Sequence, residues 1–454
     1  MALVGEVTIP NDKSITHRSI LFAVLATGIS RVKLHSVGRD NLASLRVARL
    51  LGAKISGNLS QEVYALAQSE GVSTDMNCWA KPHSELIING DGLHSLKAPQ
   101  EILDCGNSGT TSRLLCGILA GQKFKASITG DESLRSRPFK RVTDPLSQMG
   151  AHFSADMLPI RITGGELKGI NYFSPKSSAQ VKSAILLAGL YADSEVTVIE
   201  PSLSRDHTEL MLLAMGVPIT TSQQADGSWK ICSRQVAQLS AIEIEVPGDF
   251  SAASFLMVAG SVVAGSDILI KNVGFNPTRI GLYDILLRMG ADITPTNKRL
   301  VGGEVVVDLK VKYAKLTATT VTAADVVRAI DEMPILAVAA AFAEGLTEVS
   351  GAMELRVKES DRIKMIVALL QDYGIKIEER EDGFSVIGNS KGIPSGRSST
   401  KDGSDWSECG DHRILMSSAV LGLALNRKLE LLHQEVVETS FPGFKEKFQD
   451  LATN

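Results

Sequence analysis

The sequence predicts an α/β protein of two or three domains that is built from a repeated αβ unit. Its 454 residues exceed the usual size of one domain. An apolar, helix-like segment that reaches a glycine and continues as a β-like run occurs five times, at intervals of 66 to 98 residues. The five segments are VARLLGAKI, PLSQMGAHF, LLAMGVPI, ILLRMGADI and ALLQDYGIKI, with their glycines at Gly52, Gly150, Gly216, Gly290 and Gly374.

Each of these glycines fits the position just after a helix, where a positive φ costs little without a Cβ atom. An α/β protein without repeats also ends its helices on glycine. The recurrence of one sequence pattern, Leu/Met-Gly-Ala-Lys/Asp-Ile, favours an internal repeat. We expect a sixth copy to end near residues 440–448.

Composition narrows the class of protein. The chain is 44% hydrophobic and 22% charged, which excludes a disordered or collagen-like protein. A net charge of −4 argues against a protein that coats nucleic acid. The longest apolar run, residues 335–343, is far shorter than the roughly 20 residues of a membrane span. The N-terminus lacks a basic stretch followed by a long apolar one, so we expect no signal peptide.

The five cysteines form no CxxC pair, which excludes a disulfide framework or a zinc ribbon and predicts a reducing, cytoplasmic location. Residues 391–410 are rich in glycine, serine and charge and predict a solvent loop. A second break is expected at residues 235–240. Beyond it, Pro247-Gly248 predicts a turn before an apolar helix of small residues.

The first motif that could carry chemistry is IPNDKSITHRS, at residues 9–19. A strand runs into a turn, and a helix is expected to begin near Ser14, with Lys13 and Arg18 in its first turns. Because the helix dipole opposes a cation there, Lys13 is expected to have an anionic partner. An ordinary capped helix with a solvated lysine is the alternative. A P-loop is excluded because its two glycines are absent.

Two further segments suit an anion. The loop at residues 106–110 presents backbone N–H groups and small hydroxyls, and Gly109 allows close approach of a ligand. In LRSRPFKR, Arg137 precedes Pro138, the expected start of a helix, and is held extended, a pose that suits a carboxylate or a phosphate. A capped turn and a solvated charged face are the respective alternatives.

The other candidates also stand at expected helix starts. Ser178, Gln180 and Lys182 head an apolar helix, although polar residues there are mostly caps. Asp331 and Glu332 precede Pro334; they are favoured by the helix dipole or supply a carboxylate base.

The segment MELRVKESDRIKM is expected to be helical, which would place Leu355, Lys358, Glu359 and Arg362 on one face. A solvated surface helix with i,i+4 ion pairs is the alternative. Another apolar helix begins at Asp411-His412-Arg413, where Arg413 is the better candidate for binding.

Taken together, cations stand repeatedly at helix starts, where the dipole opposes them unless an anion lies between them. The pattern predicts small, highly anionic, phosphorylated substrates. No cluster has the spacing of metal ligands, and neither GxSxG nor GxGxxG occurs, so we expect no metal and no nucleotide cofactor.

The order of the motifs resembles that of the enolpyruvyl transferases, and most closely the members that act on shikimate 3-phosphate. The resemblance runs from Gly5 to Phe444. The motifs are DKSITHR, LDCGNSGTTSR, GDESLRSRPFKRV, SSAQVKSAILLAGL, SRDHTE, NPTR, DEMP, ELRVKESDR, GDHR and TSFPGF.

The resemblance implies an α/β (α+β) fold of two domains with six βαβαββ repeats, three in each domain. One domain would span residues 14–243, and the other residues 1–13 plus 244–454, with the active site in the cleft between them. The implied reaction moves the enolpyruvyl group of phosphoenolpyruvate to the 5-hydroxyl of shikimate 3-phosphate and releases phosphate, through a tetrahedral intermediate. The enzyme would be a cytoplasmic monomer of aromatic amino-acid (chorismate) biosynthesis, without cofactor, nucleic acid or membrane.

The resemblance also implies roles for individual residues. Asp331 would take the proton of the 5-hydroxyl, while Glu359 and Lys13 would serve the methylene carbon and the leaving phosphate. Shikimate 3-phosphate would be bound by Lys13, Ser14, Arg18, Ser178, Ala179, Gln180, Arg205, Asp331 and Lys358. Phosphoenolpyruvate would be bound by Lys13, Gly109, Arg137, Gln180, Arg362 and Arg413.

Three positions deserve comparison with the family pattern. Asn11 stands where the family usually has glycine; because asparagine tolerates positive φ, we expect the turn to persist. Thr439-Ser440 occupies the place of a lysine that in some relatives contacts phosphoenolpyruvate. Gly109 is the residue that glyphosate-resistant relatives replace with alanine, so we predict sensitivity to glyphosate.

Two rival interpretations remain at this point. The first is enolpyruvyl transfer to UDP-N-acetylglucosamine; those relatives carry a cysteine in the loop matching 130–138, which has none here, and usually asparagine where Ser14 stands. The second is a non-catalytic anion-binding protein or scaffold on the same fold. Against it, Lys13, Asp331, Glu359 and Arg362 are all present.

Overall fold

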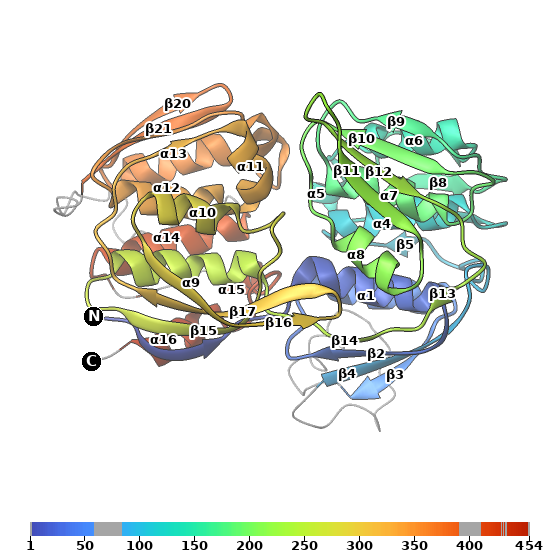
Figure 1. Cartoon of the computed structure of the whole chain (residues 1–454), viewed down its shortest axis with the longest axis horizontal. Helices are drawn as coiled ribbons and strands as arrows, with labels where there is room; N and C mark the ends of the chain where they lie inside the picture. The colour runs from blue at the N-terminus through green and yellow to red at the C-terminus, as the bar shows by residue number, and fades with distance from the viewer. Residues whose placement is uncertain are drawn as a thin grey trace. The chain divides into compact units, whose positions relative to one another are not determined.

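The protein is described here by a computed structural model of residues 2–58, 84–389, 410–427, 429, 431 and 434–452. The chain forms two compact units. Unit 1 contains residues 1–10, 247–300 and 305–454, and unit 2 contains residues 11–246 and 301–304 (Figure 1). The solvent loop predicted at residues 391–410 falls almost wholly outside the described residues.

The described residues of unit 2 form three sheets, and helices cover them (Figure 1). Its strands are β2 (Ala26–Leu34), β3 (Lys54–Asn58), β4 (Ser84–Asp91), β5 (Leu103–Asp104), β6 (Lys125–Thr129), β7 (His152–Phe153), β8 (Ile160–Thr163), β9 (Asn171–Phe173), β10 (Val196–Glu200), β11 (Ile219–Gln223), β12 (Trp229–Ser233), β13 (Leu239–Ser240) and β14 (Glu243–Glu245). Its helices are α1 (Lys13–Leu25), α2 (Arg39–Leu50), α4 (Gly109–Ala120), α5 (Glu132–Arg135), α6 (Lys140–Met149), α7 (Ala179–Gly189) and α8 (His207–Ala214).

The described part of unit 1 contains two sheets of four strands. Its strands are β1 (Val4–Thr8), β15 (Asp267–Gly274), β16 (Asp292–Val301), β17 (Glu304–Lys312), β18 (Thr320–Val321), β19 (Gly345–Val349), β20 (Lys376–Arg380) and β21 (Gly383–Gly388). Its helices are α9 (Phe250–Val262), α10 (Gly281–Arg288), α11 (Ala323–Ala329), η2 (Ile330–Glu332), α12 (Met333–Ala341), η3 (Met353–Val357), α13 (Arg362–Asp372), α14 (His412–Ala424), α15 (Gln434–Val437) and α16 (Phe444–Leu451).

All five described sheets share one topology, which confirms the predicted repeat. In each sheet a parallel pair of strands is followed by two antiparallel strands, in the spatial orders β5-β6-β8-β7, β9-β10-β12-β11, β18-β19-β21-β20, β1-β15-β17-β16 and β13-β2-β4-β3. In the first three sheets helices link the strands in the chain order βαβαββ. In the last two the outer parallel strand comes from elsewhere in the chain: β1 precedes residues 11–246, and β13 follows β2, β3 and β4, with β14 as a fifth strand that also pairs with β2. The sixth expected copy includes residues 390–409, which lie outside the described residues.

The five repeat glycines all have positive φ, as the sequence predicts. Their φ angles are 88° at Gly52, 115° at Gly150, 95° at Gly216, 87° at Gly290 and 74° at Gly374. Each follows the last residue of its helix by one or two positions, where backbone N–H groups bond back to the final carbonyls.

Gly443, in the sixth expected segment, has a different place. It also has positive φ, 72°, but it caps the start of α16 rather than the end of a helix.

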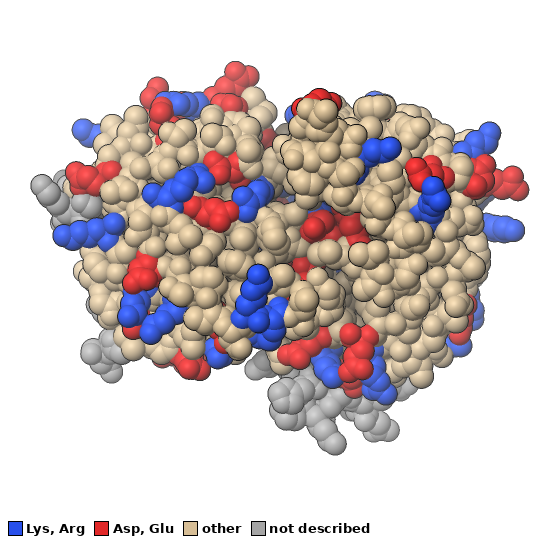
Figure 2. Space-filling model, viewed as in Figure 1, with Lys and Arg blue, Asp and Glu red and all other residues tan. Residues whose placement is uncertain are grey.

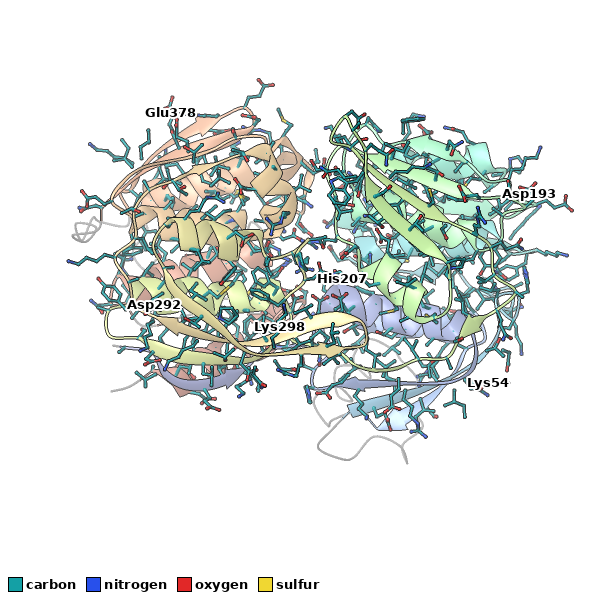
Figure 3. All side chains as sticks on the ribbon, in the orientation of Figure 1. Lys54, Asp193, His207, Asp292, Lys298 and Glu378 are labelled. Atoms are coloured by element: carbon teal, nitrogen blue, oxygen red, sulfur yellow. The ribbon has the colours of Figure 1, made fainter. Side chains whose placement is uncertain are left out.

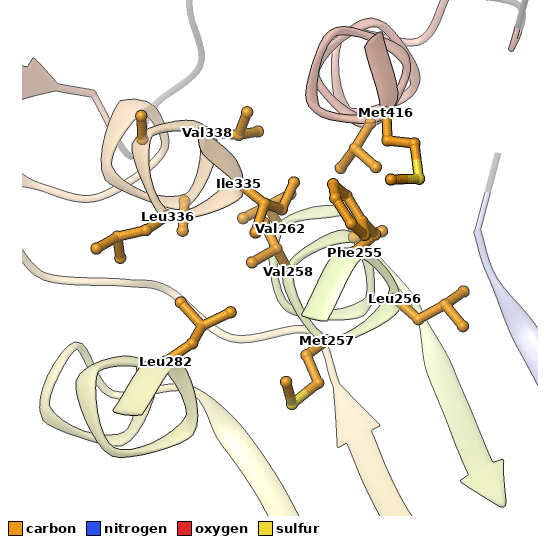
Figure 4. Packing of buried hydrophobic residues seen from close by; sticks show 14 of the residues in the cluster. Phe255, Leu256, Met257, Val258, Val262, Leu282, Ile335, Leu336, Val338 and Met416 are labelled. Atoms are coloured by element: carbon orange, nitrogen blue, oxygen red, sulfur yellow. The ribbon is translucent and has the colours of Figure 1, made fainter. Parts of the chain in front are cut away.

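Each unit has its own hydrophobic core. In unit 1 the helix predicted after Pro247-Gly248 is α9, and all of its residues are buried. Its small residues let α12 and α14 pack against it. Figure 4 shows Phe255 of α9 beside Met416 of α14, and Val258 beside Ile335 of α12.

In unit 2, α4 and α7 cross at backbone distance. A Cβ atom added to Gly117 would lie 2.2 Å from the carbonyl oxygen of Ala184. Only glycine allows this approach. The crossing fixes the starts of both helices, which carry candidate site residues.

Two smaller features depart from expectation. Pro138 does not start a helix, because α6 begins two residues later at Lys140. The tip of the β16–β17 hairpin, residues 301–304, belongs to unit 2, where Glu304 Oε1 lies 2.6 Å from Nδ1 of the buried His207. Figure 3 labels His207.

Surface charge and helix hydropathy describe the exterior of the protein. On the face shown in Figure 2, acidic and basic side chains are interspersed. No helix among the described residues is long and apolar enough to cross a membrane.

We predict that Gly117→Ala lowers stability, because its methyl group must push α4 away from α7; overpacking of this kind costs about 1–3 kcal/mol. Gly422→Ala in α14 is the matched control. Its Cβ would have its nearest neighbour at 3.9 Å, so the free energy of unfolding should stay level or rise by about 0.5–1 kcal/mol. Thermal unfolding midpoints measure both changes, and equal midpoints for the two variants would contradict the crossing described above.

Candidate active site

The first turn of α1 holds Lys13 beside a carboxylate. Asp12 caps the helix by accepting the Ile15 N–H at 2.8 Å. Lys13 Nζ lies 2.5 Å from Asp40 Oδ2 at the start of α2, and Asn41 Nδ2 donates to the Lys13 carbonyl at 3.0 Å. The anionic partner that the sequence predicts for Lys13 is therefore supplied by the protein itself.

Arg18 is buried one turn further along α1. Its Nε donates to Thr208 Oγ1 at 2.7 Å, its Nη1 to the Ser14 carbonyl at 3.0 Å and its Nη2 to Ser183 Oγ at 3.1 Å. Burial lowers the pKa of Arg18 to about 10, and the nearby charge of Arg205 acts in the same direction. Arg18 therefore connects α1 to the starts of α7 and α8, close to Arg205.

The loop before α4 gathers Gly109, Arg137 and Gln180. Ser108 caps α4 by accepting the Thr111 N–H at 3.1 Å. Arg137 Nη2 donates to Asn107 Oδ1 at 2.8 Å, and a Cβ added to Gly109 would lie 3.5 Å from Arg137 Nη1. Gln180 Nε2 donates to Thr110 Oγ1 at 3.3 Å. Three of the residues predicted to bind phosphoenolpyruvate thus surround one loop of unit 2.

At the start of α7 the candidate residues divide into two groups. Ser178, Ala179 and Gln180 are half-buried, and the Ser178 hydroxyl does not cap the helix. Lys182 is buried instead, with Nζ 2.9 Å from Glu200 Oε1 and 2.7 Å from Glu209 Oε1. Its ammonium also donates to the carbonyl of Ser204, beside Arg205, at 3.1 Å. Lys182 therefore anchors the Arg205 loop.

In unit 1 three cations surround Asp331, which lies in η2. Arg362 Nη1 is 3.3 Å from Asp331 Oδ1, Lys358 Nζ is 3.9 Å from the same atom, and Arg413 Nη2 is 3.9 Å from Oδ2. Arg413 also donates to the Asp331 carbonyl at 3.1 Å. Burial lowers the pKa of Lys358, partly opposed by Asp331.

Arg362 is wholly buried and contacts two further carboxylates. Its Nη2 donates to Glu359 Oε2 at 2.6 Å, and its Nε to Asp411 Oδ2 at 2.8 Å. Burial lowers the pKa of Arg362, but Asp411, Glu359 and Asp331 together outweigh burial and raise it. Asp411 also caps α14 through the Arg413 N–H, at 3.0 Å. Asp411 thus contacts the two arginines of unit 1 that are predicted to bind phosphoenolpyruvate, Arg362 through its guanidinium and Arg413 through its backbone N–H.

The expected continuous helix over residues 353–365 is wrong. The short η3 ends at Val357, Lys358 is extended, and α13 begins only at Arg362 after the Asp361 cap. Asp361 accepts the Lys364 N–H, so its side chain ends the preceding loop and starts a new helix. Lys358, Glu359 and Arg362 come together around Asp331 through this loop and not through one helix face.

Asn11 keeps its turn for a different reason than expected. It is not among the residues with positive φ. Its side-chain oxygen accepts the backbone N–H groups of His35 at 2.5 Å and Ser36 at 2.9 Å, and its Nδ2 donates to the Val246 carbonyl. A glycine could make none of these side-chain bonds.

Sequence reasoning missed the partners that hold the site residues. Asp40, Asn107 and His17 stand in motifs or elements without a chemical signature of their own. Only the position of His17 inside DKSITHR pointed to it. At the other end of the chain, Thr439 Oγ1 donates to the Val436 carbonyl at 2.7 Å, so a helix-end hydroxyl occupies the place of the family lysine.

No group of three or more His, Cys, Asp or Glu side chains that could hold a metal ion occurs within the described residues. The described site residues offer carboxylates, guanidinium groups, ammonium groups and helix-start N–H groups. Such donors bind phosphates and carboxylates, and the carboxylates can accept protons.

Comparison with solved structures agrees with this chemistry. EPSP synthase from Acinetobacter baumannii superimposes with a TM-score of 0.80 at 41% identity, covering 99% of this chain and 96% of that one. The enolpyruvyl transferase NikO from Streptomyces tendae superimposes with a TM-score of 0.71, at 16% identity and over 99% and 95% of the two chains, which shows the shared fold. Fold and site together define an enolpyruvyl transferase.

Sequence relatives narrow the class. The family model of EPSP synthase (3-phosphoshikimate 1-carboxyvinyltransferase) matches residues 1–81 and 70–448. The 3-phosphoshikimate 1-carboxyvinyltransferase of Citrifermentans bemidjiense is 46% identical over 97% of this chain and 95% of its own, and that of Desulforamulus reducens is 42% identical over 99% and 97%. The chain belongs to the EPSP synthase family. Transfer to UDP-N-acetylglucosamine is not favoured.

We predict that the buried His17 makes the stability of the protein fall on the acid side. Burial lowers its pKa to about 3, with Lys13 and Arg18 acting in the same direction and Asp40 against it. Between pH 6.5 and pH 3 the unfolded chain therefore binds a proton at His17 that the folded chain does not. The free energy of unfolding consequently decreases as the pH falls through this range. From pH 7 to pH 5 this one group lowers the free energy of unfolding by about 2 kcal/mol.

The measurement is urea unfolding at pH 7 and pH 5 for wild type and His17→Asn. In His17→Asn the free energy of unfolding should fall less between pH 7 and pH 5, by the contribution of His17. His35, whose side chain is 47% exposed, supplies the matched control, since His35→Asn should keep it. Equal acid losses in wild type and His17→Asn would contradict the prediction.

Proposed function

We propose that this chain transfers the enolpyruvyl group of phosphoenolpyruvate to the 5-hydroxyl of shikimate 3-phosphate and releases phosphate. The observation that carries the proposal is Asp331, a carboxylate bordered by Lys358, Arg362 and Arg413. A proton acceptor surrounded by anion-binding groups is what the addition of a hydroxyl to phosphoenolpyruvate requires. The family of the chain supports the same reaction.

The proposal assigns residues of both units to the two substrates. Shikimate 3-phosphate is bound by Lys13, Ser14, Arg18, Ser178, Ala179, Gln180, Arg205, Asp331 and Lys358. Phosphoenolpyruvate is bound by Lys13, Gly109, Arg137, Gln180, Arg362 and Arg413. Arg18 and Arg362 are already bonded to protein oxygens, so their contribution is a fixed orientation as well as charge.

The reaction proceeds by addition and then elimination. The 5-hydroxyl oxygen attacks C2 of phosphoenolpyruvate and gives its proton to Asp331, while C3 takes a proton from the Glu359/Lys13 pair. The resulting tetrahedral intermediate loses a proton from C3 as the C2–O bond to phosphate breaks. The same pair thus gives C3 its proton in the addition and takes a proton from C3 in the elimination. We place the enzyme in the cytoplasm as a monomer that needs no metal or organic cofactor.

We predict that phosphate is released from phosphoenolpyruvate with shikimate 3-phosphate as acceptor and not with UDP-N-acetylglucosamine. Asp331→Asn should lower kcat by about 100-fold or more, because the amide cannot take the 5-hydroxyl proton, while shikimate 3-phosphate still binds. The assay is phosphate release, with binding followed by calorimetry.

Asp292 on β16 is exposed, and Asp292→Asn is the matched control that keeps wild-type kcat. Release with neither acceptor would overturn the proposed function. Full turnover by Asp331→Asn would remove Asp331 from the proton transfer while leaving the reaction in place.

We predict that wild-type enzyme is inhibited by glyphosate at millimolar concentration, as the glycine at position 109 implies. Gly109→Ala should weaken this inhibition by about 10-fold or more, since one methyl group in a tight site is worth 1–3 kcal/mol. The new Cβ would lie 2.5 Å from Arg113 Nη1, so that guanidinium must also move. Initial rates across a glyphosate series measure both effects, and equal wild-type rates with and without the inhibitor would refute the prediction.

A further inference from the structure

His17 lies at the meeting point of three helices of unit 2. Its Nδ1 is 2.8 Å from Ser44 Oγ of α2 and 3.3 Å from Thr111 Oγ1 of α4, and its Nε2 is 3.4 Å from Ser108 Oγ at the start of α4. The hydroxyls also bond to each other, with Thr111 Oγ1 2.8 Å from Ser44 Oγ and 2.7 Å from Ser108 Oγ. We call these four side chains the His17 hub.

The hub has no contact with solvent. His17, Ser44 and Thr111 are 0% exposed and Ser108 is 1% exposed. A buried polar cluster is stable only where its members satisfy one another. A neutral imidazole has one donor and one acceptor nitrogen, and the hydroxyls can rotate to match either tautomer.

Each hub residue stands within about one helical turn of a residue in the candidate site. Lys13 precedes His17 by one turn of α1, and its ion-pair partner Asp40 precedes Ser44 by one turn of α2. Gly109 and Thr110 lie between Ser108 and Thr111. The hub thus joins the helix starts that present Lys13 and Gly109.

We propose that His17 is a positioning residue for enolpyruvyl transfer: it fixes the starts of α1 and α4 so that Lys13 and the Gly109 loop bind the same phosphoenolpyruvate molecule. This inference rests on the proposed function. His17 acts through its hydrogen bonds and exchanges no proton with the substrates. Its low pKa agrees with this role, because the ring stays neutral over the working range of the enzyme.

Directed bonds are needed here because the two helix starts are separate anion sites. Apolar packing would hold the helices near each other but would not fix their rotation or sliding. A displacement of about 1 Å at a binding group can cost about 100-fold in rate. The hub prevents such a shift through hydrogen bonds from both nitrogens of one rigid ring.

The test compares His17→Leu, His17→Asn and Ser44→Ala with the wild type in steady-state phosphate release. His17→Leu should raise KM for phosphoenolpyruvate by about 10-fold or more, and KM for shikimate 3-phosphate by less. His17→Asn retains a donor and an acceptor and should recover most of the loss. Adding Ser44→Ala to His17→Leu should change KM no further, because the hub is already broken.

The matched control is Ser19→Ala. Ser19 is also buried on α1, but its hydroxyl donates only to the Ile15 carbonyl of the same helix, at 2.9 Å. It should keep the wild-type KM values. If His17→Leu does not fold, Ser44→Ala and His17→Asn carry the test, since each removes only part of the hub.

The pH profile separates positioning from proton transfer. When kcat/KM is plotted against pH, the acid and alkaline limbs of the profile should have the same midpoints in wild type and in His17→Asn. A displaced acid limb would overturn the inference by making His17 a proton-transfer group, and unchanged KM values with lowered thermal stability would overturn it by making the hub merely structural. Wild-type enzyme without turnover would overturn the proposed function and this inference together, whereas normal turnover with an unaffected His17→Leu would overturn the inference alone.

Discussion

The site in unit 1 depends on one buried guanidinium. Arg362 is 1% exposed, and moving such a charge out of water costs several kcal/mol unless it is paired and hydrogen-bonded. Asp411, Glu359 and Asp331 supply that pairing from three separate segments of the chain. The cation therefore holds η2, the loop before α13 and the start of α14 at fixed distances. Loss of Arg362 itself would remove the cation that pairs with all three carboxylates, including Asp411, which is 0% exposed.

Unit 2 achieves the same kind of positioning with a mixture of charge and neutral hydrogen bonds. Lys13 is held by Asp40, and Lys182 by Glu200 and Glu209. The His17 hub, in contrast, joins helix starts through neutral hydrogen bonds. A neutral joint suits this place, because another cation beside Lys13 and Arg18 would be repelled, and another anion would compete with a bound phosphate.

Local signals in the sequence predicted much of the fold. The C-terminal glycines of five helices were predicted because each depends on residues within one turn. The Asp and Ser caps of α1, α4 and α14 are equally local, but they were not assigned from the sequence. The helix expected over residues 353–365 is wrong because Asp361 caps a new start. Arg356 contacts both Asp361 and the distant Glu379, and the second of these contacts cannot be inferred from the local pattern. The Asn11 bonds to His35 and Val246 and the hub around His17 join residues far apart in the chain, which no periodicity reports.

The cations at helix starts were predicted to need bound anions, and that argument holds only in part. Asp40, Asp411 and Glu209 already supply negative charge to Lys13, Arg362 and Lys182. These carboxylates let the cations be built into fixed positions before any substrate arrives, which is how a preorganised site avoids reorganisation during the reaction. Under the proposed function, a phosphate that binds Lys13 competes with Asp40 for the ammonium group, and the proposed donors Gly109 N–H and Arg137 help to decide that competition. The positive charge that the protein's own carboxylates leave uncompensated at such a site is therefore small. Affinity for an anion then depends on the positions of the donor groups, which the His17 hub and the Arg362 cluster fix.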